Sequence, residues 1–327
     1  MKVLVSIQQP VRAWQIPVEC VDTLRQRFPE ITWEHATDPE SRARGLADCD
    51  VAYTWILSAA ELAAAPRLAW LHTSAVAVET LALPELFARG VIVSNTRGVQ
   101  ATPIAEHVMA VMLGLAKQLP FVLEAQRDRR WAQNEFFGPR LPWLLKGRTL
   151  GLIGVGTIGG EIARLATAFG MDVIALRRRA QREAVAGVSE MLPPDALDAL
   201  LARSDVLVIA APLTPQTLGM MGAAQFAKMK RGAILINVGR ARIIDHVALG
   251  QALSSGHLGG ASVDVYHREP LPPDDPLWIR PNVILTPHTS GFRQGHWDEV
   301  IDLFSDNIRR YQRSEPVRFR VEPELGY

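Results

Sequence analysis

The chain has few cysteines and almost no net charge. Cys20 and Cys49 are its two cysteines, too few for a disulfide framework or a cysteine-based zinc site. A balance of 35 basic and 34 acidic residues leaves a formal net charge of +1, which argues against bulk electrostatic binding to nucleic acid. We therefore expect a protein with no metal and no nucleic-acid partner.

Long hydrophobic runs are also missing. No apolar stretch approaches the roughly 20 residues that a membrane helix needs, and the segment from Met1 to Ile7 has the length of a strand without the core of a signal peptide. We expect a cytoplasmic protein with no membrane partner. With 327 residues, 48% of them hydrophobic and 21% charged, the composition is that of a globular protein long enough for two domains.

What the chain does have is a glycine-rich turn between two apolar runs. The run Leu150–Ile153 leads into Gly154, Gly156 and Gly159, helical spacing follows, and a second run ends at Leu176. This order of strand, turn, helix and strand is typical of a dinucleotide-binding βαβ unit. The three glycines permit a tight turn, close approach of the backbone to a pyrophosphate, and close packing of the helix on the sheet.

The residues after the second run indicate which dinucleotide binds. Proteins that bind NAD usually place a carboxylate about 20 residues after the turn, where it holds the ribose 2′-hydroxyl. This chain has Arg177, Arg178 and Arg179 there, and guanidinium groups bind a 2′-phosphate that a carboxylate would repel. The sequence therefore predicts NADP(H) as the preferred cofactor, with NAD(H) possible, and Arg177 and Arg178 as ligands of the phosphate.

Alternating strand and helix patterns predict an α/β fold. Four runs before the glycine-rich turn predict a small parallel domain: Val3–Ser6, Val51–Thr54, Ala69–His72 and Val91–Ser94. Six runs from the turn onward suit a doubly wound parallel sheet: Leu150–Ile153, Val173–Leu176, Val206–Ala210, Ala233–Asn237, Gly260–Asp264 and Asn282–Leu285.

Two further helical segments are expected, and the first of them is a natural connector between the domains. Residues 101–119 have the spacing of a long amphipathic helix, residues 293–313 also have helical spacing, and residues 120–146 show no clear period but much aromatic surface. We expect a discontinuous substrate-binding domain over residues 1–100 and 292–327. Residues 101–291 would form the NAD(P)-binding Rossmann domain.

Three side chains that can perform acid–base chemistry follow predicted strands. Ligands of doubly wound sheets bind outside the carboxyl ends of the strands, and Arg240, Glu269 and His288 each come shortly after one of the last three runs. An arginine can bind a carboxylate and polarise a carbonyl. An imidazole can donate a proton as hydride arrives, and a nearby carboxylate would favour the imidazolium. Spacing alone leaves open that all three are structural.

The chain resembles the D-isomer-specific 2-hydroxyacid dehydrogenases over nearly its whole length. The similar segments are Asn95 with Gly98 and Ala105–His107, Ala211–Thr214 with Thr217, Met229–Lys230 with Gly232–Ala233, Asn237–Arg240 with Ile244–Asp245 and Ala248–Leu249, Asp264–Tyr266 with Glu269–Pro272, and Thr286–His288. The resemblance implies that Arg240, Glu269 and His288 are catalytic. It also implies a flavodoxin-like substrate domain beside the Rossmann domain, and a homodimer.

The same resemblance implies further residues of the cofactor site. Asp264 would lie near the nicotinamide amide, and the backbone at Thr157 and Ile158 would bind the pyrophosphate. The residues that would line the cofactor cleft are Pro212, Thr217, Val238 and Ser290.

The loop after the run Ala69–His72 departs from the family pattern. The family commonly has a glycine-rich segment there, whose backbone N–H groups hold the substrate carboxylate, whereas residues 74–79 contain no glycine. Backbone donors survive such a change, so Val76 and Ala77 are candidates for substrate binding together with Arg240. His107 follows Glu106 on the predicted helix, and because adjacent helical positions do not face each other, we interpret His107 as structural or capping.

The combined prediction is a D-specific reductase that transfers hydride from NADPH to a small 2-oxo acid, with glyoxylate or hydroxypyruvate favoured and His288 as the acid–base group. Two alternatives stay open. One is a reductase for a larger 2-oxo acid. The other is a non-enzymatic, nucleotide-sensing corepressor, since such relatives resemble this chain even at the catalytic residues.

Overall fold

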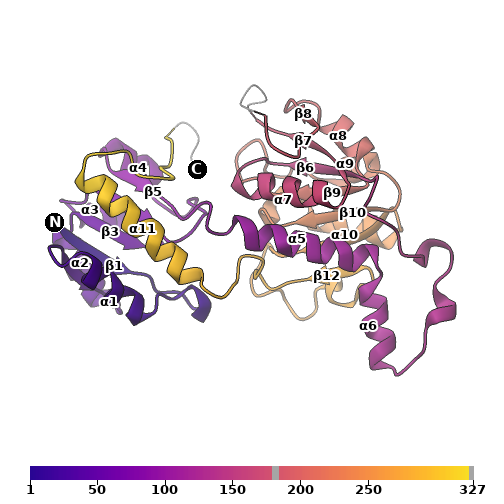
Figure 1. The fold of residues 1–327 in the computed structure, drawn as a ribbon, viewed down its shortest axis with the longest axis horizontal. Helices are drawn as coiled ribbons and strands as arrows, with labels where there is room; N and C mark the ends of the chain where they lie inside the picture. Colours follow the sequence, from indigo (N-terminus) through magenta and orange to yellow (C-terminus); the bar gives the residue numbers. More distant parts are fainter. Residues whose placement is uncertain (179–183, 324–327) are drawn as a thin grey trace. The chain divides into compact units, whose positions relative to one another are not determined.

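The computed structural model describes residues 1–178 and 184–323. Contacts between residues divide the chain into two units, as the ribbon in Figure 1 shows. Unit 1 comprises Met1–Gln100 and Phe292–Tyr327, and unit 2 comprises Ala101–Gly291. The chain thus leaves unit 1 after about a third of its length, builds unit 2, and returns.

In the described residues, unit 1 holds a five-stranded parallel sheet in the order β2-β1-β3-β4-β5, which is the flavodoxin-like order. The strands are β1 (Lys2–Ser6), β2 (Thr32–His35), β3 (Val51–Thr54), β4 (Trp70–Thr73) and β5 (Ile92–Ser94). The helices are η1 (Arg12–Trp14), α1 (Val18–Arg27), α2 (Pro39–Asp48), α3 (Ala59–Ala63), α4 (Leu83–Ala88) and α11 (His296–Gln312). Apolar residues of α1 and α11 pack with one face of the sheet, and those of α2, α3 and α4 with the other.

Unit 2 holds, within the described ranges, a seven-stranded parallel sheet in the order β12-β11-β10-β9-β6-β7-β8. This is the doubly wound Rossmann order with one added strand. The strands are β6 (Thr149–Ile153), β7 (Asp172–Leu176), β8 (Glu190–Leu192), β9 (Val206–Ile209), β10 (Ala233–Asn237), β11 (Leu258–Val263) and β12 (Val283–Leu285). The helices are α5 (Ala101–Ala116), α6 (Leu119–Arg127), η2 (Gln133–Glu135), η3 (Gly138–Arg140), α7 (Thr157–Ala168), α8 (Leu197–Arg203), α9 (Ala223–Lys228), η4 (Ala241–Ile243), α10 (His246–Ser254) and η5 (Pro276–Ile279).

Both faces of the larger sheet are covered by helices, and this explains its continuous apolar strands. Successive residues of a strand point to opposite faces, so Leu152 packs with α5 and α7 while Ile153 packs with α8, α9 and α10. The same alternation holds in β9, where Val208 and Ile209 enter the two different clusters. The predicted fold class, a Rossmann sheet with a smaller flavodoxin-like domain, is confirmed.

Two strands were not predicted. β2 is half exposed and includes Glu34, and β8 has three residues at the edge of its sheet, so neither shows a run of apolar residues. The expectation of six strands in the larger sheet is therefore wrong, because the described part of unit 2 has seven.

The helix predicted over residues 101–119 is also shorter than expected. α5 ends at Ala116, Gln118 adopts a left-handed conformation with φ of 57°, and α6 begins at Leu119 and extends into the stretch that showed no clear period. Within the described residues no single helix is long and apolar enough to cross a membrane. α5 and α6 meet that condition of length and composition only as a pair bent by 68°, and most of α5 is buried in unit 2.

Candidate active site

Arg240, Glu269 and His288 all lie at the carboxyl edge of the larger sheet. They follow β10, β11 and β12 respectively, and these three strands are neighbours in the sheet. Parallel strands end at the same edge, so the three loops emerge side by side. The fold therefore brings the three predicted residues to one edge of unit 2.

His288 and Glu269 form a direct pair. His288 Nδ1 lies 2.8 Å from Glu269 Oε2, and the backbone N–H of Tyr266 donates to Glu269 Oε1 at 2.9 Å. The hydrogen bond to Glu269 raises the pKa of His288, aided by the charges of Glu269 and Asp264 and opposed by burial and by Arg240. Burial alone would raise the pKa of Glu269, but the bonds from His288 and Tyr266 lower it.

This pairing fixes the roles of the two imidazole nitrogens. Since Nδ1 is engaged by the carboxylate, Nε2 is the nitrogen left to exchange a proton with a ligand. The His288 side chain is 53% exposed, so a ligand can reach it. Its backbone has φ of 54°, the left-handed region that is unfavourable for a residue with a side chain, and its N–H donates to Thr286 O at 2.9 Å.

Arg240 stands on a tightly packed turn. Asn237 Oδ1 accepts from the backbone N–H of Gly239 at 3.0 Å, and Asn237 Nδ2 donates to Arg240 O at 3.2 Å. A Cβ atom at Gly239 would lie 2.8 Å from Ala211 O, so only glycine allows the turns after β9 and β10 to approach this closely. The guanidinium is partly exposed and donates to Gly239 O at 2.7 Å.

Asp264 is a buried carboxylate beside the pair, only 1% exposed. Its Oδ1 accepts from the Thr286 hydroxyl at 2.6 Å and from the Thr289 N–H at 2.9 Å, and its Oδ2 accepts from the Ser290 N–H at 3.2 Å. These donors offset the cost of burying the charge. Asp264 thereby fastens the chain on both sides of His288.

The glycine-rich turn has the geometry of a phosphate site. Gly154 has φ of 95°, and a Cβ at Gly159 would lie 2.2 Å from Gly154 O, so both positions require glycine. A Cβ at Gly156 would instead point into open space. Among the described residues no side chain caps α7, so the first-turn N–H groups, including those of Thr157 and Ile158, are free of helix hydrogen bonds and can bind an anion.

The other predicted cofactor residues also follow strands of the larger sheet, at their carboxyl ends. Arg177 and Arg178 follow β7, and the Thr217 hydroxyl, after β9, donates to Pro212 O at 2.8 Å. Val238 follows β10 and is buried, and Ser290 follows β12. Arg179 lies outside the described residues.

Val76 and Ala77 belong to unit 1, in the loop after β4. Neighbouring side chains hold this loop although it has no glycine: Asn95 Nδ2 donates to Val76 O at 2.9 Å, and the Thr96 hydroxyl donates to Ser74 O at 2.8 Å. Both candidates are partly exposed, as backbone donors to a substrate must be.

Two residues of unit 2 acquire importance that the sequence did not indicate. The Tyr266 hydroxyl lies 2.7 Å from Val263 O and 2.9 Å from Thr286 O, so it joins the loops that carry Glu269 and His288. His107, which we interpreted as structural or capping, lies with Nε2 3.4 Å from Thr286 Oγ1. The contacts that Tyr266 and His107 make with Thr286 are revealed only by the three-dimensional structure, because Thr286 is distant from both in sequence.

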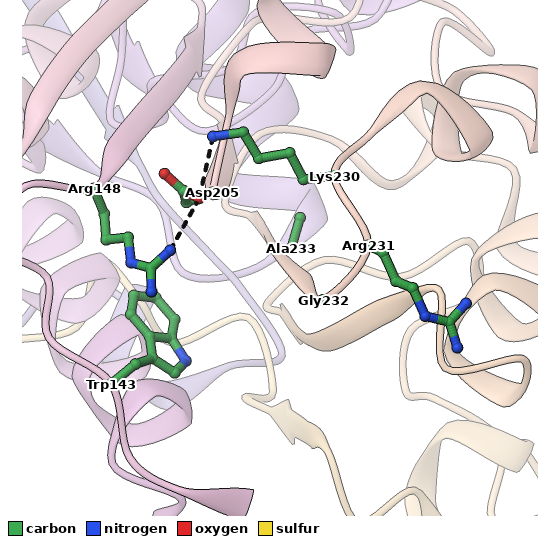
Figure 2. Close-up of a pocket in the computed structure, with 7 residues that line it drawn as sticks. All are labelled: Trp143, Arg148, Asp205, Lys230, Arg231, Gly232 and Ala233. Atoms are coloured by element: carbon green, nitrogen blue, oxygen red, sulfur yellow. Dashed lines mark hydrogen bonds and ion pairs between the residues drawn. The ribbon is translucent and has the colours of Figure 1, made fainter. Parts of the chain in front are cut away.

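A cavity of about 380 Å³ opens at the opposite edge of the sheet, where β6, β9 and β10 begin. Figure 2 shows Arg148 and Lys230 converging on one carboxylate, with Asp205 Oδ1 3.4 Å from Arg148 Nη1 and 3.1 Å from Lys230 Nζ. Arg148 also lies over the ring of Trp143. Because Arg148 and Lys230 both pair with Asp205, we interpret this cavity as structural and not as part of the reaction site.

Comparisons with known proteins identify similar chains. A family model described as D-isomer specific 2-hydroxyacid dehydrogenase, NAD binding domain, matches residues 109–290. The chain is 32% identical over 308 residues to a glyoxylate reductase of Korarchaeum cryptofilum, with 92% of each protein covered. It is 38% identical over 265 residues to a glyoxylate/hydroxypyruvate reductase B of Pectobacterium carotovorum, covering 80% of this chain and 81% of that protein.

Solved structures agree with these matches. An NADPH-dependent glyoxylate/hydroxypyruvate reductase of Sinorhizobium meliloti, in complex with NADP and sulfate, aligns with a TM-score of 0.82 and 28% identity. The alignment covers 100% of this chain and 99% of that one.

Proposed function

Because this chain belongs to the D-isomer specific 2-hydroxyacid dehydrogenase family, we propose that it is an NADPH-preferring, D-specific reductase of a small 2-oxo acid, with glyoxylate or hydroxypyruvate as substrate. The chain is an oxidoreductase with a nicotinamide cofactor site. The observation that carries the proposed chemistry is the Glu269–His288 pair beside Arg240 at one sheet edge.

Each of the three residues has one role in the proposed reaction. The Arg240 guanidinium binds the substrate carboxylate and polarises the neighbouring carbonyl. Protonated His288 donates a proton from Nε2 to the carbonyl oxygen, which becomes the hydroxyl of the product. Glu269 holds Nδ1 and stabilises the imidazolium, so the raised pKa of His288 suits reduction, which consumes a proton. When bound, NADPH supplies the hydride that the carbonyl carbon receives.

The preference for NADPH is proposed from the residues after β7. Arg177 and Arg178 stand where a carboxylate would favour NAD, and guanidinium groups pair with a 2′-phosphate. The Sinorhizobium meliloti reductase, described as NADPH-dependent, supports the same choice. The first turn of α7, with Thr157 and Ile158, would bind the pyrophosphate, while Pro212, Thr217, Val238, Asp264 and Ser290 would contact the rest of the cofactor.

The homodimer and the domain roles are also part of the proposal. Apolar side chains on α6 and the segment after it are exposed, with Trp131 at 89% and Phe137 at 71%. Figure 1 shows this segment reaching away from the body of unit 2. We propose that a second copy of the chain covers it, and that unit 1, through Val76 and Ala77, binds the substrate carboxylate. The cytoplasmic location stays a prediction.

The proposed activity is tested by initial rates of nicotinamide oxidation. Glyoxylate, hydroxypyruvate, pyruvate and phenylpyruvate are each assayed with NADPH and with NADH. We expect rapid oxidation of NADPH by the two small acids, and loss of turnover by orders of magnitude in His288→Asn with the Kd for NADPH unchanged. Preference for phenylpyruvate would favour the reductase of larger acids. Absence of turnover with tight NADPH binding would favour the nucleotide-sensing corepressor.

A further inference from the structure

A chain of three polar side chains runs from helix α5 to the loop after β12 that carries His288. His107 of α5 lies with Nε2 3.4 Å from Thr286 Oγ1, and Thr286 Oγ1 lies 2.6 Å from Asp264 Oδ1. All three residues belong to unit 2. This chain ends next to His288. Asp264 accepts the backbone N–H of Thr289, and the carbonyl of Thr286 accepts the backbone N–H of His288.

The direction of these hydrogen bonds indicates which ring nitrogen of His107 carries a proton. A hydroxyl has one hydrogen to donate, and the short contact with the acceptor-only carboxylate of Asp264 uses the hydrogen of Thr286. Thr286 Oγ1 can then only accept from His107, so the proton of the His107 ring must reside on Nε2. Burial lowers the pKa of His107, with the charge of Asp264 opposing, which favours the neutral ring with one N–H.

We propose that His107 is a positioning residue for the acid–base group, acting through Thr286 and Asp264. Donation by His107 keeps the Thr286 hydroxyl directed at Asp264, and Asp264 then holds the Thr289 and Ser290 amides. The expected effect on turnover rests on the proposed function, whereas the hydrogen-bonded arrangement itself does not.

The positioned segment needs such support because its backbone is strained. His288 has φ of 54°, a conformation that persists only where the surroundings enforce it. Two hydrogen bonds hold the backbone around His288: the Thr286 carbonyl accepts the His288 N–H, and Asp264 accepts the Thr289 N–H. If the Thr286 hydroxyl were free to rotate, the backbone on that side of His288 would be held less firmly. The Nε2 of His288 would then be in a productive position for the substrate less often.

The protonation state is tested directly by nuclear magnetic resonance. The chain has eight histidines, so ¹⁵N-histidine labelling gives a countable set of ring signals, and His107→Gln identifies the one that belongs to His107. We expect the neutral Nε2–H form in the wild type, and its loss or mixing with the Nδ1–H form in Thr286→Val. A neutral Nδ1–H form in the wild type would overturn the proposal.

Matched variants test the effect on the reaction. Gln places its amide nitrogen near the position of imidazole Nε2, whereas Asn is too short and Leu has no donor. We expect His107→Leu and His107→Asn to lower kcat by about two- to tenfold, the amount one neutral hydrogen bond supplies, with the Tm and the Kd for NADPH unchanged. His107→Gln should restore kcat. Glu106→Gln, on the exposed neighbouring position of α5, is the control and should match the wild type.

The outcomes separate this inference from the proposed function. Equal kcat for the Gln and Asn variants, or a loss that follows the Tm in all variants, would show a merely structural role and overturn the inference. Absence of turnover by the wild type with every 2-oxo acid would refute the proposed function. The resonance measurement would still decide whether the His107–Thr286–Asp264 chain exists.

Discussion

Two glycines at the start of α7 allow the folding role and the binding role of the phosphate turn to be separated. In Gly156→Ala the new methyl points into open space, since outside the local backbone no described atom lies within 4 Å of it. The φ of −97° at Gly156 is accessible to alanine. Lower entropy of the unfolded chain offsets poorer N-capping by alanine, so we expect the free energy of unfolding to change by less than about 1 kcal/mol.

Gly159→Ala meets the opposite situation. Its methyl would lie 2.2 Å from Gly154 O, so the backbone must shift, at the upper end of the roughly 1–3 kcal/mol that overpacking costs. The higher helix propensity of alanine returns about 1 kcal/mol. A net loss of about 2 kcal/mol lowers the Tm by about 4–8 °C in a unit of this size.

The two variants should rank in the opposite order by cofactor affinity: Gly156→Ala, the more stable of the two, should bind NADPH more weakly. The methyl of Gly156→Ala would occupy the space proposed for the pyrophosphate, and we expect the Kd for NADPH to rise at least tenfold, about 1.4 kcal/mol. The assays are thermal melts without cofactor and fluorescence titration with NADPH. Gly160→Ala is the control, because its methyl would meet Val185 Cγ1 at an ordinary 3.6 Å. Wild-type affinity in Gly156→Ala would refute the placement of the pyrophosphate at α7.

Three further substitutions test other parts of the structure. Glu269→Gln removes the carboxylate that raises the pKa of His288. The loss of reductase activity as His288 deprotonates with rising pH should then begin at lower pH, and an unmoved kcat/KM profile would contradict the pairing. Arg177→Asp should shift the ratio of kcat/KM for NADPH over NADH at least tenfold toward NADH; an unchanged ratio excludes the proposed 2′-phosphate contact. Tyr53→Phe removes a buried hydroxyl with no hydrogen-bond partner among the described residues, which costs about 1–3 kcal/mol, so calorimetry should give an equal or higher Tm. A lower Tm would reveal a partner such as a buried water.

The sequence predicted strands well where burial on both faces makes them continuously apolar. Ala233–Asn237 was predicted with the bounds that β10 has, because each of its residues is buried. β2 was missed, since Glu34 and its neighbours are half exposed at a sheet edge. The break after α5 was missed as well, because Gln118 adopts its left-handed conformation without the glycine that usually signals one.

The candidate site was predictable to the extent that strand order fixes position. Arg240, Glu269 and His288 share an edge because their strands are parallel neighbours, and the spacing of the sequence already suggested this. Their catalytic roles stay predictions. The contact between His107 and Thr286 was not predictable, because it depends on how α5 packs on the sheet and not on any local pattern.

The return of the chain to unit 1 has a consequence for synthesis. The core of unit 1 includes Val300, Phe304 and Ile308 of α11, so the face of the sheet that α1 and α11 share cannot be fully covered until α11 has left the ribosome. At about 5–20 residues per second, synthesis of the roughly 190 residues of unit 2 takes about 10–40 s. Unit 2 can fold during that time, whereas unit 1 waits with apolar strands exposed. We therefore expect a nascent chain stalled near residue 291 to bind chaperones through residues 1–100.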